Sequence, residues 1–448
     1  MIPTTNENEK VVNKLRNKLP KILHFESITG IGADQLIEPI RSAILFGDEE
    51  SILIELGRSV FLFFPNCLIP SPDFDFVNLI IGLLNFENNQ IVEKAIILLG
   101  YVYVNFSNHR QVLEENDFHY FVAKNLVSSD VISILTKMMK ANPLLINGIL
   151  DNGFMDEIYD MLISNMGNQK CETFIALLSC ASLLVKIGIP SICTAAPSMI
   201  TEFQDFIKTP CKSSHYVLKF INSRVECMID TINHLRLYYW LIKRFFDFEA
   251  QSHSIIINIL ISALQPSTVN EYVEYGVFSL VDSILSDDLD HPYFRVQNLA
   301  IDLLTNVLKV DNRLIGFVLQ TSLVDTVSII LNAGQIRESI SALSFFIYLL
   351  HFTENSTVKT IFERINIVGF MLETLEMDST NLTIDILEAF IILIRNKENI
   401  VTLNNELSNT IESHRFHESI NRLANLESDN NRISELCEVV LSMCYNKI

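Results

Sequence analysis

Glycine and proline are scarce in this sequence, which has only 14 glycines and 12 prolines among 448 residues. These two residues break helices and form tight turns, so their scarcity leaves few turn positions. An all-β sandwich or barrel needs many short strands separated by turns, and the sequence therefore argues against both. Hydrophobic residues make up 49% of the chain, which excludes a mostly disordered protein. Long helices with short connections remain as the expectation.

Patterns that would indicate reactive chemistry are also missing. The eight cysteines include no C-x-x-C pair; they are Cys67, Cys171, Cys180, Cys193, Cys211, Cys227, Cys437 and Cys444. Most lie in apolar helical patterns, as reduced, buried thiols of an intracellular protein do. The nearest metal-ligand pairs, Cys211 with His215 and His414 with His417, lack the second pair that a metal site needs. Without a Gly-rich phosphate loop or a nucleophile elbow, we expect no catalytic residue, no metal and no cofactor, and we predict that the protein is not an enzyme.

Long hydrophobic runs and excess positive charge are absent as well. No segment reaches the roughly 18 apolar residues that a membrane span needs, and the first twenty residues contain no apolar core of a secretory signal. The 33 basic and 53 acidic residues give a net charge of −20, which disfavours nucleic acid or a membrane as the main partner. An acidic surface suits basic proteins or peptides, although it also serves solubility alone. We expect a cytoplasmic or nuclear protein.

One helical pattern recurs along the chain. It is clearest in Phe294–Val310, where apolar residues occur at i, i+3, i+4 and i+7. Copies of this pattern lie about 40 residues apart, and Asn88, Ser128 and Ser252 are among the turn-forming residues that precede them and could cap the helices. The position four residues after each copy's start is always apolar. The nine starts are Ile52, Ile91, Val131, Cys171, Tyr216, Ile256, Val296, Ile336 and Leu382.

A second signal divides each period. Gly153 and Gly276 stand where one short helix would end and another begin, because glycine readily adopts the left-handed conformation that terminates a helix. Each repeat is therefore predicted to contain a short, a middle and a long third helix. A period near 40 residues with two or three helices is typical of the armadillo and HEAT class. We predict a repeat solenoid over residues 31–400, after a polar lead-in of residues 1–30 and before capping helices in residues 401–448.

The third-helix pattern resembles the armadillo repeat family. The likeness is carried by Val296–Val307, with the small Ala300 where neighbouring helices approach, by Asn89–Gly100, and by the preceding short helix in Arg110–Phe118. The resemblance implies an all-α fold, a right-handed α–α superhelix (armadillo-like solenoid), whose third helices line a concave groove. Armadillo proteins hold extended peptides or partner helices in that groove.

The family includes nuclear import adaptors of the importin-alpha kind, whose third helices carry a Trp and an Asn at repeated positions. At the corresponding positions of this sequence only Asn306 fits and no Trp does, so that groove chemistry is not carried over. The basic residues between Lys10 and Lys21 are faintly similar to the importin-beta-binding segment of those adaptors. An ordinary solvated helix accounts for them more simply.

Eight residues are candidate partner-binding residues. Seven occupy groove positions of the repeat, and the eighth is the only Trp. They are Arg58, Tyr101, Lys137, Asn222, Glu226, Trp240, Asp302 and Asn306. Trp240 lies in the basic and aromatic stretch Lys208–Arg244, which could stack bases or hold an acidic peptide. Its aromatic residues could equally pack the core of an irregular repeat, and the sequence leaves this choice open.

We predict a non-catalytic interaction scaffold or adaptor that binds a segment of a protein or peptide partner along a concave helical groove. Two alternatives stay open: a diverged nuclear transport or cargo adaptor, and a helical regulatory domain of an enzyme complex. The sequence identifies neither the partner, nor the binding face, nor the oligomeric state.

Overall fold

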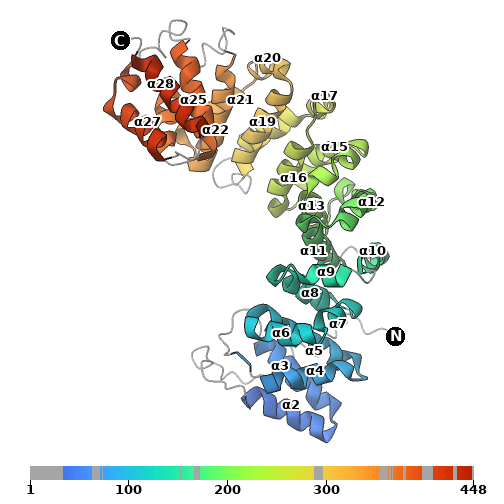
Figure 1. Cartoon of the computed structure of the whole chain (residues 1–448). Helices are drawn as coiled ribbons and strands as arrows, with labels where there is room; N and C mark the ends of the chain where they lie inside the picture. The colour runs from blue at the N-terminus through green and yellow to red at the C-terminus, as the bar shows by residue number, and fades with distance from the viewer. Residues whose placement is uncertain are drawn as a thin grey trace. The chain divides into compact units, whose positions relative to one another are not determined.

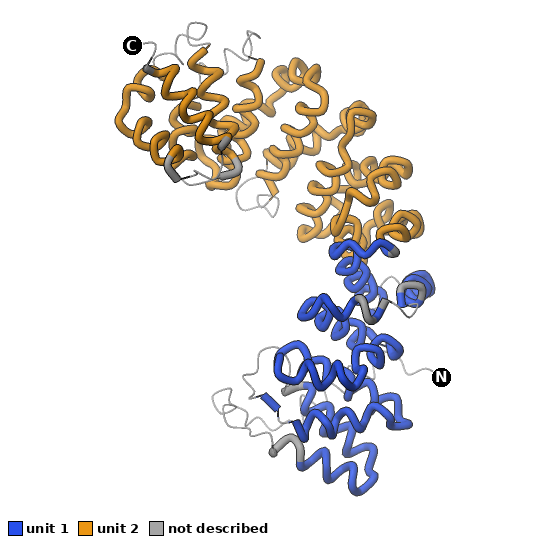
Figure 2. Tube along the Cα trace, viewed as in Figure 1, with its two compact units in different colours: residues 1–192 blue, residues 193–448 orange. Residues whose placement is uncertain are grey.

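The computed structural model of the protein is all-α in the residues that it describes (Figure 1). These are residues 34–62, 71–72, 74–126, 128–150, 154–165, 172–286, 296–352, 362, 365, 367–376, 380–395, 407–426 and 431–445. The chain divides into two compact units, residues 1–192 and 193–448 (Figure 2). Within each unit the helices stack as successive repeats, which confirms the predicted all-α solenoid. The predicted lead-in of residues 1–30 lies outside the described residues.

Unit 1 is a stack of repeats that each end in a third helix, and each third helix packs on the next one along the chain. The third helices are α3 (Glu49–Leu62), α5 (Asn89–Asn105), α8 (Ser129–Ala141) and α11 (Glu172–Ile187). The helices that precede them are α2 (Asp34–Phe46), α4 (Phe74–Gly82), the 3-10 turn η2 (Leu83–Asn85), α6 (Ser107–Glu115), α7 (Phe118–Lys124), α9 (Leu145–Leu150) and α10 (Phe154–Asn165).

Unit 2 continues the same scheme with a longer row of third helices. They are α13 (Ser214–Asn222), α16 (Ala250–Ala263), α19 (Gln297–Val310), α22 (Ile336–Leu350), α25 (Thr380–Arg395) and α28 (Asn431–Tyr445). Between them lie η3 (Val225–Cys227), α14 (Ile229–His234), α15 (Leu237–Lys243), η4 (Phe245–Asp247), α17 (Val269–Glu274), α18 (Val277–Leu285), η6 (Asn312–Leu314), α20 (Ile315–Val318), α21 (Leu323–Ala333), α24 (Ile367–Glu376) and α27 (His414–Leu426). Helix α12 (Pro190–Lys208) precedes α13 and contains the boundary between the units.

The predicted order of a short, a middle and a third helix is confirmed in α6–α7–α8 and in α17–α18–α19. The repeat that begins near Tyr216 differs from this order. Its third helix α13 has only nine residues, and the single 19-residue helix α12 replaces the short and middle helices. The repeat register is therefore retained in this segment while the helix lengths are redistributed.

Capping side chains set the start of two third helices, as predicted. The side chain of Asn88 accepts a hydrogen bond from the backbone N–H of Gln90 at 3.0 Å, and Ser128 accepts one from Val131 at 3.4 Å. Such bonds satisfy N–H groups that the first helical turn leaves unpaired. The same prediction is wrong for Ser252, which lies buried inside α16 and pairs with His215 of α13 instead.

Left-handed residues mark the junction between short and middle helices. Gly276, with φ of 92°, separates α17 from α18 as predicted. Asp117 (φ 53°) occupies the same junction between α6 and α7, and Arg236 (φ 51°) occupies it between α14 and α15. Non-glycine residues rarely adopt this conformation, so a search for glycine alone overlooked two of the three junctions. Gly153 lies outside the described residues.

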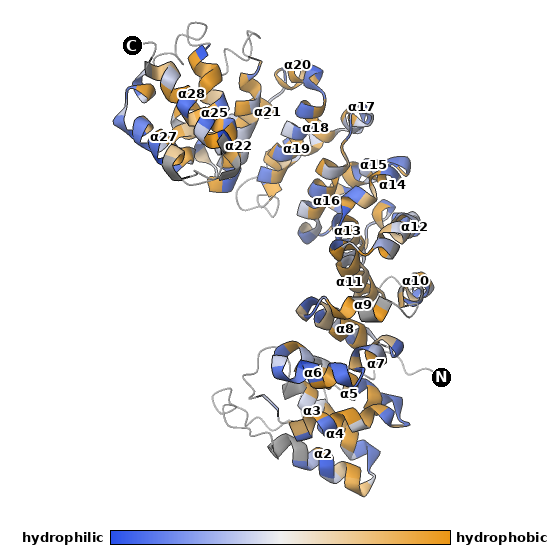
Figure 3. Cartoon of the chain, in the orientation of Figure 1, coloured by the Kyte–Doolittle hydropathy of each residue, from blue (hydrophilic) through white to orange (hydrophobic). Residues whose placement is uncertain are grey.

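Hydrophobic and hydrophilic residues alternate around the helices of both units (Figure 3). Most of the predicted inward positions are buried; Val131 and Leu135 of α8, for example, are fully buried. The predicted register is wrong in α22, where Ile336 is 65% exposed and Ile340 is half-buried. Helix α22 has apolar residues on several faces, so its sequence fits two registers, and the structure buries the one that contains Phe346.

Apolar spacing in the sequence predicts a polar helix around Arg415–Leu426 and a final helix Asn431–Tyr445 with one apolar stripe, and α27 and α28 agree with these bounds. Helix α28 packs against α25 and α27. Ile433, Leu436, Cys437, Val440 and Cys444 of this stripe are buried. Because α27 also packs on α24, these helices extend the stack in the way the preceding pair does.

Among the described residues no single helix is long and apolar enough to cross a membrane. One pair of helical segments, Asn312–Val318 and Leu323–Ala333, meets the length and composition criterion only when taken together, and the chain bends by 87° between them.

Helices α5 and α8 pack closely at Gly100. A Cβ atom built on Gly100 would lie 2.2 Å from Cγ1 of Ile134, far inside van der Waals contact. Gly100→Ala should therefore destabilise the protein, because overpacking costs about 1–3 kcal/mol and exceeds the roughly 1 kcal/mol that alanine contributes in a helix. Chemical denaturation followed by circular dichroism measures the change.

The matched control is Gly82→Ala at the end of α4, where no atom lies within 4 Å of the added Cβ and the backbone is helical. Without a clash, this substitution should leave stability unchanged or raise it by up to about 1 kcal/mol. Equal effects of the two substitutions would show that α5 and α8 do not meet at Gly100.

A buried histidine makes the stability of unit 2 sensitive to acid. His215 on α13 lies 2.9 Å, Nδ1 to Oγ, from Ser252 of α16. Burial lowers the pKa of His215, Lys219 lowers it further, and Glu249 opposes them. Burial likewise lowers the pKa of His253. Both side chains bind a proton more readily in the unfolded state, so the stability that they contribute is lost as pH falls below the ordinary histidine pKa of about 6.5.

We expect the free energy of unfolding to decrease between about pH 7.5 and pH 5, and we expect His215→Asn to weaken this pH dependence. Urea denaturation at a series of pH values tests both expectations. The same substitution at the exposed His234 is the matched control and should leave the pH dependence intact. An unaltered pH profile of His215→Asn would contradict the assignment.

Candidate partner-binding surface

Each third helix of unit 2 buries part of its surface and leaves polar side chains accessible along the rest. In α19 the accessible stripe contains Asn298, Asp302, Asn306 and Lys309, whose spacing keeps them on one face of the helix. We call the accessible stripes together the third-helix surface of unit 2. Its residues are Tyr216, Lys219 and Asn222 of α13, Asn258 and Ser262 of α16, the four residues of α19, Ser344 and Tyr348 of α22, Asp385 and Glu388 of α25, and Arg432 of α28.

Contacts between neighbouring stripes show that several of them lie on one side of the unit. Nζ of Lys309 on α19 lies 6.0 Å from the ring centroid of Tyr348 on α22, whose hydroxyl donates to the backbone oxygen of Leu308 at 2.9 Å. Arg432 of α28 donates to Glu388 of α25 at 2.9 Å. The stripe of α19 therefore joins that of α22, and the stripe of α25 joins that of α28.

Asp302 and Asn306 were predicted to occupy two groove positions of the same third helix, and the structure places them one turn apart on α19. Asn306 is half-buried, and its Nδ2 donates to the backbone oxygen of Asp302 at 2.8 Å. Burial raises the pKa of the Asp302 carboxyl, while a hydrogen bond with Ser341 and the charge of Lys309 oppose the shift. Asp302 is thus a partly desolvated carboxylate at the helix surface, a condition that a cationic group of a ligand would relieve.

In unit 1 the structure brings together two of the three predicted residues. Nζ of Lys137 on α8 lies 5.0 Å from the ring centroid of Tyr101 on α5, which is within the range of a cation–π interaction. Tyr101 is only 7% exposed, so its ring lies buried beneath the Lys137 ammonium group. Arg58 of α3 stands apart, is exposed, and pairs with Glu55 of its own helix at 3.6 Å.

The other three predicted residues lie on separate elements. Asn222 ends α13 and is half-buried, whereas Glu226 is exposed in η3. Trp240 of α15 is half-buried, and its ring centroid lies 5.0 Å from that of Tyr239 in an edge-to-face arrangement. The structure therefore does not bring Trp240 into the third-helix surface of unit 2, whose helix in this repeat is α16.

The basic and aromatic stretch Lys208–Arg244 contributes in part to the core. Tyr238 is buried, stacks on Tyr272 at a centroid distance of 4.8 Å, and donates a hydrogen bond to Glu271 at 2.6 Å. Three cations of this stretch or its edge lie near acidic residues: Arg236 is 3.6 Å from Glu271, Arg244 is 3.0 Å from Asp247, and Lys208 is 3.5 Å from Asp205. These pairs reduce the positive charge that nucleic acid or an acidic peptide would need.

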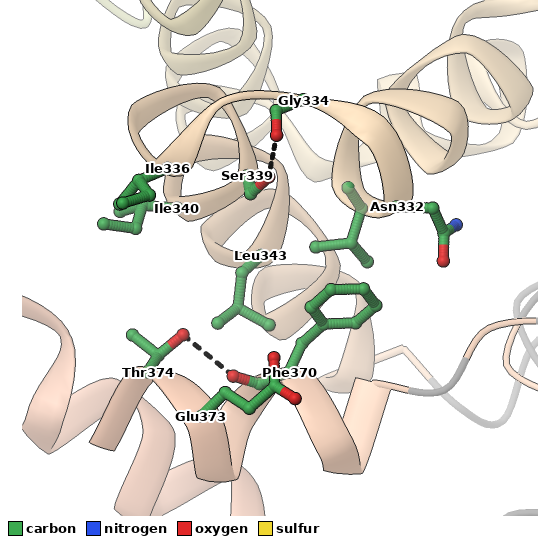
Figure 4. A pocket seen from close by; sticks show the side chains of 10 residues that line it. Asn332, Gly334, Ile336, Ser339, Ile340, Leu343, Phe370, Glu373 and Thr374 are labelled. Carbon is green, nitrogen blue, oxygen red and sulfur yellow. Dashed lines mark hydrogen bonds between the residues drawn. The ribbon is translucent and has the colours of Figure 1, made fainter. Parts of the chain in front are cut away.

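A cavity of about 190 Å³ lies where the turn between α21 and α22 meets α24 (Figure 4). Leu331, Leu343 and Phe370 are among the apolar residues that line it, and Glu373 stands at its rim. Sequence reasoning missed this cavity. The signal that could have revealed it is the pair Ile336 and Ile340, apolar residues that line the cavity because they lie outside the buried register of α22.

Glu373 is the charged residue among those that line this cavity, and the nearby hydroxyl groups are used in local hydrogen bonds. The hydroxyl of Thr374 donates to the backbone oxygen of Phe370 at 2.8 Å, and that of Ser339 lies 3.4 Å from the backbone oxygen of Gly334 (Figure 4). Glu373 is exposed. An apolar floor with one carboxylate at the rim suits an apolar side chain that carries or neighbours a positive charge.

The described part of the chain contains no group of three or more His, Cys, Asp or Glu residues placed to hold a metal ion. In the Cys211 and His215 pair, which the sequence does not predict to bind a metal, Nδ1 of His215 lies 2.9 Å from the Ser252 hydroxyl, and Sγ of Cys211 lies 3.6 Å from the Ser214 hydroxyl. The arrangement of the candidate residues offers polar and apolar contacts rather than a convergent reactive set.

Comparison with solved structures identifies the fold. The chain is similar to an engineered protein known from a crystal structure, with a TM-score of 0.62 and 11% identity over 92% of this chain and 98% of that one. It is also similar to a chain from a study of the phosphorylation switch that controls the interaction between cadherin and beta-catenin, with a TM-score of 0.52 and 13% identity over 92% and 91%. No protein-family profile and no curated protein matches the sequence. The chain is an α-helical repeat protein with an armadillo-like solenoid fold.

Asp302→Asn should stabilise the folded protein at neutral pH. The raised pKa means that the ionised carboxylate is disfavoured in the folded state, and this penalty is fully present above the folded-state pKa. Asparagine keeps the shape without the charge, so the free energy of unfolding should rise, by less than about 1 kcal/mol. The difference from the wild type should shrink in acid as Asp302 itself becomes protonated. Urea denaturation at neutral and acidic pH measures both effects, and a destabilised variant at neutral pH would contradict them.

Proposed function

We propose that this protein is a non-catalytic interaction scaffold or adaptor of the armadillo class, and that it binds an extended segment of a protein partner along the third-helix surface of unit 2. The observation that carries the proposal is the row of accessible polar stripes on consecutive third helices. These stripes are the part of each third helix that packing leaves free. The similarity to a structure concerned with cadherin and beta-catenin supports the fold on which such a surface is built.

The dimensions of the surface suit an extended chain. Packed helices lie about 8–10 Å apart, and an extended peptide advances about 3.3 Å per residue. A peptide that crosses the third helices would therefore present a side chain to each helix about every third residue. Amide and hydroxyl groups such as those of Asn258, Asn306 and Ser344 can pair with its backbone.

The Asp302 carboxylate favours a partner segment with a basic side chain opposite it, although the surface as a whole also contains three cations, Lys219, Lys309 and Arg432. Carboxylates of Asp302, Asp385 and Glu388 belong to the surface, although Arg432 pairs with Glu388. Since burial disfavours the ionised form of Asp302, a lysine or arginine of the partner would gain more from this carboxylate than from a fully solvated one. The expected partner is therefore a basic peptide segment within a larger protein.

The proposal can be tested with peptides selected for binding. A random peptide library panned against the purified full-length chain should yield basic peptides, and fluorescence anisotropy gives their affinities. Asp302→Lys should weaken binding at least about tenfold, which corresponds to about 1.4 kcal/mol. Asn306→Ala should weaken it less.

Asp325→Lys on α21 is the matched control, because it makes the same charge change at an exposed position outside the third-helix surface of unit 2. It should leave the affinity within about twofold of the wild type. Equal losses for Asp302→Lys and Asp325→Lys would mean that the peptides respond only to net charge. An unchanged affinity for Asp302→Lys would place the binding site elsewhere.

A further inference from the structure

Two half-buried cysteines lie beside an arginine in unit 2. Cys193 is on the first turns of α12, and Cys227 ends η3. Nη1 of Arg224 lies 3.8 Å from Sγ of Cys193. The thiol of Cys227 is within hydrogen-bonding reach of the Cys193 thiol. Two thiols and one guanidinium therefore meet at one partly accessible place, although 33 residues separate the cysteines in sequence.

The other described cysteines have different surroundings. Cys180 and Cys437 are fully buried and Cys444 is 4% exposed, so all three belong to the core. Cys211 is half-buried beside the hydroxyl of Ser214. Cys67 and Cys171 lie outside the described residues. Among the described cysteines, Cys193 and Cys227 are the ones that combine partial exposure with a neighbouring thiol.

The chemistry of this pair follows from its neighbours. A thiol attacks a disulfide as the thiolate. Burial and the Cys227 thiol raise the pKa of Cys193, whereas the Arg224 guanidinium acts in the opposite direction. The resting Cys193 thiol is therefore protonated, and Arg224 stabilises the thiolate that forms on Cys193 before it reacts. The Cys227 thiol is close enough to attack a mixed disulfide formed on Cys193.

We propose that Cys193 and Cys227 form a modification site, a dithiol that small-molecule disulfides such as glutathione disulfide oxidise reversibly. The Cys193 thiolate attacks one sulfur of glutathione disulfide, which gives a mixed disulfide and releases one glutathione thiolate. The Cys227 thiolate then attacks the Cys193 sulfur, which forms the Cys193–Cys227 disulfide and releases the second glutathione. Two electrons pass from the two cysteines to glutathione disulfide, and the two thiol protons end on the released glutathione molecules.

The disulfide would join α12 to η3 and close a loop that contains all of α13. A cross-link of this kind restricts the unfolded chain and so raises the thermal stability of the segment that it closes. The inference is independent of the proposed function, because its outcome does not depend on any partner.

The full-length protein, first reduced and then freed of reductant, should be incubated with glutathione disulfide, blocked with an alkylating reagent and digested without reduction. Mass spectrometry should reveal a peptide cross-linked between Cys193 and Cys227, and dithiothreitol should remove it. The rate should increase with pH, because the attacking group is the thiolate. The melting temperature of the oxidised protein should rise by several degrees.

Variants separate the roles of the three residues. Cys227→Ser should accumulate glutathione on Cys193, because the resolving thiol is gone. Arg224→Gln should slow the first step several-fold, whereas Lys243→Gln, which removes an exposed charge from the same unit, should leave the rate unchanged. Wild-type protein that carries glutathione on Cys193 without the cross-link would overturn the proposal, as would a cross-link to any other cysteine in place of Cys227.

Discussion

The packing of each third helix against the next one is the constraint on which the structure depends. Helix α19 contacts α16 on one side and α22 on the other, with α18 behind it. Three covered sides require apolar or small side chains around most of the helix, and the close approach of Ile134 to Gly100 shows how little tolerance there is. A single repeat cannot bury its own apolar face, so stability arises from the stack. The accessible stripe of a third helix is left uncovered by the neighbouring helices and does not need apolar or small residues.

The accessible stripe is where a polar or charged residue can be placed without loss of the core. Asp302 shows that this freedom has a limit, since even on the stripe its carboxylate is partly desolvated by the flanking helices. In the proposed binding surface, such a partly desolvated carboxylate would attract a cationic group of the partner. The cavity beside α24 is also exposed surface that packing does not explain. Ile336 at this cavity is 65% exposed, and a polar residue there would be better solvated.

Local patterns were predictable from the sequence, and contacts between distant segments were not. The bounds of α28, the cap at Asn88 and the turn at Gly276 depend on neighbouring residues, which the sequence displays directly. The left-handed Asp117 and Arg236 were missed because their conformation is imposed by the packing of the two helices that they join. For the candidate site, the shared stripe of Asp302 and Asn306 followed from helical spacing. The approach of Lys137 to Tyr101 and of Cys227 to Cys193 could not be foreseen, because each joins segments more than 30 residues apart.

The low identity to structures of the same fold follows from the same constraint. Burial in a solenoid specifies which positions must be apolar or small, and many residue combinations satisfy that pattern, so 11% and 13% identity can accompany a shared fold. The stripes are under no such requirement and can diverge completely. A partner specificity encoded there would leave no trace in a comparison of whole sequences. Under the proposed function, the residues of the third-helix surface of unit 2, rather than the repeat pattern, are therefore where partner specificity would be encoded.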